Sequence, residues 1–286
     1  MIRTYQLIDG RMLYVEADLT GAYDNSDYDT QDRGGKVEQV SRALLYLLDE
    51  DRVFVFDTVE STDPGYTKKW LLHLPQRPDI PNLRVKLGNE NAGILESPSE
   101  RLSMVNGRGR LDLVRLAPEE AVIRLVGGEG YEYYVEADGD DQVLNGIDFG
   151  EGSHKASWFD NGLWRIEIQP TRPNPNQLDR FLVALSPSLR GSNPTPVKPL
   201  RLSSGEALAA YTDTSLLLFD IGHFREPVRL EVPGRQTRLL IAGVSVGDRF
   251  EVDLGDRQET VSVTQSGLIE FTLDAQAGRI SIRRHP

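Results

Sequence analysis

The segment Val53-Phe54-Val55-Phe56, within RVFVFDTVES at 52–61, decides which kind of fold this sequence can adopt. It is apolar without alternation, and so is a second segment, Leu216 to Phe219. A strand with one buried face alternates apolar and polar residues, whereas a strand covered on both faces does not. We therefore expect both segments to be strands packed in the middle of a layered β structure.

Shorter segments around them alternate apolar and polar residues, which is typical of strands with one buried and one solvated face. The pattern holds at 131–136, 164–168, 228–232 and 250–254. Turn-forming pairs such as Asn106-Gly107 separate these segments and supply the positive φ of tight hairpins. The sequence therefore predicts an all-β protein, an antiparallel sandwich with almost no helix.

The stretch 37–48 fits two structures. Its apolar residues recur at spacings of three and four, which suits one face of a helix. An acidic turn at 49–51 and a strand starting at Arg52 follow directly, and this order favours a β-hairpin. We favour the hairpin and keep the helix as the alternative.

Composition excludes several classes of function. The 286 residues carry a formal net charge of -12, which argues against nucleic-acid binding because phosphate neutralisation needs a basic face. The absence of Cys excludes disulfides and thiolate metal sites. The longest apolar runs are too short to span a membrane, and MIRTYQLIDG at the start predicts no signal peptide.

A proline-rich stretch, PSLRGSNPTPVKP at 187–199, interrupts all apolar patterning and is typical of an extended linker. We therefore predict two domains. Residues 1–190 would form a large β-sandwich, and residues 200–286 a smaller C-terminal β-sandwich.

Six segments together resemble the C-terminal β-sandwich half of heparinase II/III-like polysaccharide lyases. They are YVEADLTGAY (14–23), VEQVSRALLYL (37–47), VFVFDTVESTDPGYTKKWLLHLP (53–75), NGRGRLDLVRLAPEEAVIRLVGG (106–128), GLWRIEIQPTRPNPNQLDRFLVALSP (162–187) and IAGVSVGDRFEV (241–252). The resemblance supports a strand at 37–48. It implies a carbohydrate-active module for an acidic, uronic-acid-containing polysaccharide, in a periplasmic or extracellular location.

The same resemblance shows what this sequence lacks. Such lyases place a catalytic Tyr and charge-neutralising His or Asn groups on an upstream α-helical toroid, and they hold a metal with His-x-His-Ala-Asp and His-Asn-Thr stretches. This sequence has none of these stretches. We therefore expect no complete catalytic site here and an α-helical toroid domain or chain as partner. The alternatives are an intact or chain-shared lyase acting by β-elimination, and a purely structural or oligomerisation domain.

Candidate ligand-binding residues are cations and aromatic rings that could grip an acidic sugar, the cation pairing with the carboxylate and the ring stacking on the pyranose. They are His73, Trp70, Lys68, His154, Lys155, Trp158, Arg108 and Arg110, with Arg101 in the same cationic stripe. Each has a plainer interpretation: a buried His73, a buried Trp anchoring a solvated loop at 154–158, and charges on the wet faces of strands.

The richest oxygen cluster is YDNSDYDTQDRGG, which places Asp24, Asp27 and Asp29 close together. Oxygen ligands of this kind suit calcium, although the spacing departs from the EF-hand loop. A solvated acidic loop is the alternative interpretation, and it is the more common fate of a charge run.

Overall fold

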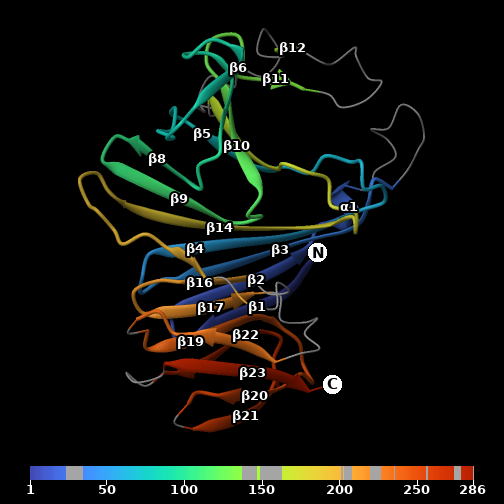
Figure 1. Cartoon of the computed structure of the whole chain (residues 1–286), viewed down its shortest axis with the longest axis vertical. Helices are drawn as coiled ribbons and strands as arrows, with labels where there is room; N and C mark the ends of the chain where they lie inside the picture. Colours follow the sequence, from blue (N-terminus) through green and yellow to red (C-terminus); the bar gives the residue numbers. More distant parts are fainter. Residues whose placement is uncertain are drawn as a thin grey trace.

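The protein is built from four stacked β layers (Figure 1). This computed structural model describes residues 1–23, 35–136, 147–148 (backbone only), 163–200, 202, 208–219, 227–234, 236–255, 257–273 and 278–285. The described residues are almost entirely strand, with one short helix among them, α1 (Thr20–Tyr23). The predicted all-β class is confirmed. No helix in the described ranges has both the length and the apolar character needed to cross a membrane.

Layers 1 and 2 belong to the N-terminal part of the chain. Layer 1 has the strand order β5 (Trp70–Leu74), β13 (Trp164–Pro170), β10 (Ala121–Gly127), β7 (Gly93–Ser97) and β6 (Arg84–Gly88). Layer 2 has the order β1 (Ile2–Ile8), β2 (Met12–Asp18), β3 (Val37–Leu47), β4 (Arg52–Ser61), β14 (Leu178–Leu189), β9 (Gly109–Ala117) and β8 (Arg101–Asn106). A separate two-stranded ribbon pairs β11 (Tyr134–Val135) with β12 (Ile147–Asp148).

Layers 3 and 4 come from the C-terminal part. Layer 3 has the order β15 (Lys198–Leu200), β16 (Leu208–Tyr211), β17 (Ser215–Phe219), β19 (Arg238–Val244) and β22 (Gly267–Thr272). Layer 4 has the order β18 (Val228–Glu231), β23 (Arg279–His285), β20 (Arg249–Asp253) and β21 (Gln258–Ser262). The β17–β19 pair is parallel, while the other described pairings are antiparallel.

The two non-alternating segments lie where the prediction places them, in strands with a layer on each side. In β4, Val55 belongs to the core between layers 1 and 2, while Phe54 faces layer 3 and its ring centroid is 5.9 Å from that of Phe219. In β17, Leu216 packs toward layer 4 and Leu217 toward layer 2. Double coverage is the physical reason why these strands have no polar face.

The stretch 37–48 is a strand, as favoured above, and the helical alternative is wrong. β3 pairs with β4 from Val37↔Ser61 to Leu47↔Arg52, and on its other side with β2. Pairing on both edges satisfies the backbone groups that a helix would satisfy internally. Of the predicted strand at 131–136, only Tyr134–Val135 is extended and paired.

The connection between β14 and β15, residues 190–197, crosses from layer 2 to layer 3 within the predicted linker region. We call it the linker. The core between these two layers draws residues from both sides of it, Leu45 and Leu182 from layer 2 and Leu217 and Leu240 from layer 3. The parts before and after the linker are therefore packed face to face over a shared core. The division into domains 1–190 and 200–286 stays a prediction.

Candidate functional site

A pocket of about 290 Å³ lies at the β8–β9 edge of layer 2, where the linker passes over the strands. One wall consists of polar side chains from β8, β9 and β14. The opposite wall is the linker segment Asn193–Pro196, which we call the linker wall. Asp79 closes the side of the pocket, because its backbone pairs with Ser103 through bonds of 2.7 and 3.0 Å.

Strand alternation gathers the polar wall. On β8, Leu102 faces the core between layers 1 and 2, so Ser103 faces the other way. The strand register then sets Ser103 opposite Asp112 of β9, and Asp112 opposite Ser186 of β14. The hydroxyl of Ser103, the carboxylate of Asp112 and the hydroxyl of Ser186 therefore form a row across three neighbouring strands along this polar wall.

Two guanidinium groups, of Arg101 and Arg110, line the pocket beside the carboxylates of Asp79 and Asp112. Arg110 forms a bidentate pair with Asp112, with Nε–Oδ2 and Nη2–Oδ1 distances of 2.8 and 2.6 Å. This hydrogen bonding, followed by the charge of Asp112, raises the pKa of Arg110. Arg101 also lines the pocket, and in the described part of the chain its side chain has no hydrogen-bond or ion-pair partner. Arg101 is therefore the cation that is available to a ligand.

Arg108 lies in the neighbouring β8–β9 turn, and Arg190, which follows β14, lies beside it. The backbone N–H of Arg190 donates to the carbonyl of Arg108 at 2.8 Å, which holds the start of the linker against this turn. Arg108 is exposed, and neither side chain has a polar partner among the described residues. Positive charge therefore extends beyond the pocket along the β8–β9 edge.

The remaining predicted ligand residues in the described ranges lie apart from this pocket. Lys68 is almost fully buried and pairs with Asp179 at 2.7 Å, so its charge is already neutralised. Trp70 is 4% exposed and belongs to the core between layers 1 and 2. His73 is exposed on the outer face of β5, contrary to the buried interpretation. Partial desolvation, then the nearby Arg165, lowers the pKa of His73.

The other predicted site residues lie outside the described residues. They are His154, Lys155 and Trp158 of the loop candidate, and Asp24, Asp27 and Asp29 of the calcium candidate. Across the described ranges, no group of three or more His, Cys, Asp or Glu side chains is arranged to hold a metal ion.

A second polar cluster lies on the outer face of layer 1, and the sequence pattern missed it. Arg124 and Glu167 occupy positions expected to be wet, yet each residue is only 2% exposed. Arg124 Nη1 lies 2.6 Å from carboxylate oxygens of both Glu167 and Glu136. Lys69 Nζ also reaches these two carboxylates, at 3.3 and 3.1 Å, and Arg165 pairs with Glu167 at 2.9 Å.

Glu96 adds a third carboxylate, 3.3 Å from Arg124 and 2.8 Å from Lys86, so three carboxylates pair with four cations in this outer cluster. A cation paired in this way has little capacity left for an anionic ligand. The one signal in the sequence is the lone Arg inside the apolar run AVIRLVG at 121–127. We therefore take the pocket beside Arg101, and not the outer cluster, as the candidate site.

No family model matches this chain, and no curated protein matches it. Among solved structures, the heparan sulfate lyase HepC from Pedobacter heparinus matches with a TM-score of 0.40 and 9% identity, over 79% of this chain and 28% of that chain. A heparinase III with methylated lysines matches with a TM-score of 0.38 and 9% identity, over 96% of this chain and 27% of that chain. This chain thus spans less than a third of either protein.

Proposed function

We propose that this chain is a carbohydrate-active β-sandwich module that binds an acidic polysaccharide at the pocket beside Arg101, and that its own residues do not complete a lyase site. The observation that carries this proposal is the Arg101 guanidinium, which has no polar partner among the described residues and lies beside a row of hydroxyl and carboxylate groups. The resemblance to heparinase II/III-like lyases, with the periplasmic or extracellular location that it implies, supports the same class of ligand.

The chemistry of the pocket suits a charged sugar. A uronic acid presents several hydroxyls and one carboxylate. Carboxylates such as Asp79 and Asp112 accept hydrogen bonds from hydroxyls, and Ser103 and Ser186 can donate as well as accept. Arg101 offers the planar fork that pairs with a carboxylate or sulfate. The volume of about 290 Å³ is near the lower end for small-molecule pockets, which suits a sugar unit or two better than a long segment.

Binding must overcome the overall charge of the protein. A formal charge of -12 repels a polyanion at long range, so attraction has to come from the local arginines at 101, 108 and 190, since Arg110 is paired with Asp112. Exposed charges act over about 8–10 Å at moderate salt. We therefore expect affinity to fall as ionic strength rises.

Affinity electrophoresis tests the proposal. The chain is run through gels containing heparin, heparan sulfate, hyaluronan, alginate or a neutral glucan, and retardation is measured. We expect retardation by at least one acidic glycan and none by the neutral one. Arg101→Ala should weaken that binding about tenfold, the loss expected for one charge-assisted hydrogen-bonding group.

Arg84→Ala is the matched control, because Arg84 is an exposed arginine on β6 of layer 1 and does not line the pocket. It should be retarded like the wild-type chain. Equal retardation of the Arg101→Ala and wild-type chains would overturn the assignment to this pocket. A wild-type chain that no acidic glycan retards would point to a structural role.

Catalysis is tested separately, by following the absorbance of the unsaturated product of β-elimination. We expect no rise when the chain alone is incubated with the acidic glycans. A rise would instead establish the intact lyase. An α-helical toroid partner stays part of the proposal, and co-expression with a candidate toroid is the way to look for it.

A further inference from the structure

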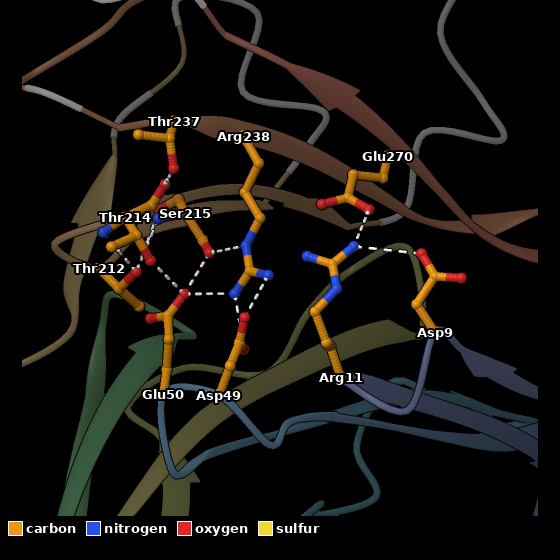
Figure 2. Close-up of polar contacts among 10 residues, drawn as sticks. All are labelled: Asp9, Arg11, Asp49, Glu50, Thr212, Thr214, Ser215, Thr237, Arg238 and Glu270. Atoms are coloured by element: carbon orange, nitrogen blue, oxygen red, sulfur yellow. Dashed lines mark hydrogen bonds and ion pairs between the residues drawn. The ribbon is translucent and has the colours of Figure 1, made fainter.

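A buried arginine in layer 3 joins the N-terminal and C-terminal parts of the chain at the β3–β4 turn (Figure 2). Arg238, on β19, has a side chain only 7% exposed, and it forms a bidentate pair with Asp49 in the β3–β4 turn at 2.8 and 2.9 Å. Its Nη2 also donates to Glu50 at 2.7 Å, and its Nε donates to the Ser215 hydroxyl at 2.6 Å. The β3–β4 turn of layer 2 is thus fixed to layer 3.

Both the side-chain carboxylate and the backbone carbonyl of Glu50 accept hydrogen bonds. Its carboxylate accepts hydrogen bonds from Arg238, from the Ser215 hydroxyl and from Thr214 Oγ1, the last at 2.6 Å. Its backbone carbonyl accepts a hydrogen bond from Arg52 Nη1 at 3.0 Å. The Asp51 carbonyl also accepts from Arg52 Nη1, at 3.1 Å, so the Arg52 guanidinium is oriented by the β3–β4 turn that the Glu50 side chain anchors to layer 3.

Arg52 continues this connection to the pocket. Its Nη2 donates to the carbonyl of Thr195, in the linker wall, at 3.1 Å. Pro194 and Pro196 have no N–H to donate. In the described part of the chain, this is the one hydrogen bond that the linker wall makes.

We propose that Arg238 is a positioning residue for the pocket, which holds the linker wall in place through Glu50 and Arg52. Its role in ligand affinity rests on the proposed function, whereas its role in fixing the linker wall does not. By reciprocity, a ligand that needs the ordered linker wall also strengthens the contact between layers 2 and 3. The C-terminal part of the chain therefore contributes to the site without touching the ligand.

Hydrogen exchange of a peptide covering 190–198 tests the positioning role without any ligand. The variants are Arg52→Met, Arg52→Lys, Arg238→Lys and Arg11→Met. Within this peptide, the N–H groups of Arg190 and Ser192 donate to the carbonyls of Arg108 and Leu189. Arg52→Met and Arg238→Lys should speed exchange of these two amides about fivefold, because release of the linker wall loosens the segment next to it. Arg52→Lys retains a donor for the Thr195 carbonyl and should restore most of the protection.

Arg11→Met is the matched control. Arg11 also bridges the two halves, with Nη2 3.2 Å from Glu270 and 3.3 Å from Asp9 (Figure 2). Among the described residues, its side chain makes no hydrogen bond to Arg52 or to the linker wall. In Arg11→Met, the amides of the 190–198 peptide should exchange as fast as they do in the wild-type chain. Unchanged exchange in Arg52→Met or in Arg238→Lys would overturn the proposal, and so would equal acceleration in Arg11→Met.

Affinity gels containing the best acidic glycan form the second arm. Arg52→Met and Arg238→Lys should be retarded several-fold less than the wild-type chain and Arg52→Lys. If these variants accelerate exchange but bind the glycan as the wild-type chain does, a role of the linker wall in affinity is overturned. If the wild-type chain binds no acidic glycan, the proposed function falls, while the exchange data still decide the positioning role.

Discussion

Arg124 and Arg238 are two buried arginines with different tasks. Arg124, on the outer face of layer 1, pairs with Glu167, whose side chain is 3% exposed. Arg238 pairs across the boundary between layers 2 and 3 with Asp49 and Glu50, whose side chains are 36% and 13% exposed. The first arginine fixes a short segment at Glu136 onto its own sheet, and the second joins distant parts of the chain. We therefore expect the burial of the partner, and not the span of the contact, to set the free energy of unfolding that is lost when each arginine is replaced.

The largest effect should come from Arg124→Met, which keeps the side-chain volume and removes the charge. The buried carboxylate of Glu167 would then have only Lys69 and Arg165 to compensate its charge. Breaking a buried pair in this way costs about 3–5 kcal/mol of unfolding free energy. Urea denaturation followed by circular dichroism measures it. Arg172→Met is the control, since Arg172 is 83% exposed and should change stability by less than about 0.5 kcal/mol. A loss below about 1 kcal/mol for Arg124→Met would contradict the comparison.

Arg238→Met should cost less, about 2–3 kcal/mol, because water can reach Asp49 once the guanidinium is gone. Glu50 would keep its hydrogen bonds from Thr214 and Ser215. The same urea titration measures this loss. A destabilisation larger than that of Arg124→Met would reverse the ranking and show that contact between the halves dominates stability.

Acid should act on the Arg124 cluster through Glu136. Burial acts to raise the pKa of Glu136, but hydrogen bonding to Arg124, and then the charges of Arg124 and Lys69, hold it at about 2, below its ordinary 4.5. A carboxylate whose pKa is lower in the folded state than in the unfolded state stabilises the fold at pH values above its unfolded-state pKa. This stabilisation is lost as the pH falls toward the folded-state pKa. The urea midpoint of the wild-type chain should therefore decrease from about pH 4.5 toward pH 2. Glu136→Gln should flatten that decrease, and an unchanged slope would contradict the assignment.

The smallest effect belongs to Arg11→Met, the exposed counterpart of Arg238 at the same junction. Arg11 is 42% exposed, its partner Asp9 is 74% exposed and its partner in layer 3, Glu270, is 23% exposed, so solvent screens these pairs more than those of Arg238. We expect no measurable change in the thermal midpoint. A shift as large as that of Arg238→Met would show that exposed pairs carry the junction.

Much of the fold follows from local patterns. The unbroken apolar runs at 53–56 and 216–219 predict strands covered on both faces, and the structure confirms this. The acidic turn at 49–51 predicts a hairpin, which β3 and β4 form. Alternation fails at Glu167, because segment 131–136 brings Glu136 to the face that the pattern marks as wet. Alternation along a strand predicts on which face of the sheet a side chain lies. It does not predict whether another segment of the chain covers that face.

The candidate site was only partly predictable. The basic stripe at 101, 108 and 110 indicates where cations gather, and Arg101 and Arg110 do line one pocket. Trp70 and Lys68 look equally suitable in the sequence, yet one is a core residue and the other is neutralised by Asp179. Separating these cases requires the burial and pairing of each side chain, which depend on residues far away in the sequence.

The β class, the doubly covered strands and the hairpin at 49–51 can be inferred from neighbouring residues and from the period of a strand. The packing of the sheets was needed to find that Arg238 meets Asp49, that Arg124 is buried, and that a linker completes a pocket over β8 and β9. Those contacts arise from the stacking of layers, which joins residues as far apart in the sequence as Gln6 and Leu268, 262 positions. Local pattern fixes the direction of a side chain, whereas its partner is fixed by the packing of whole sheets.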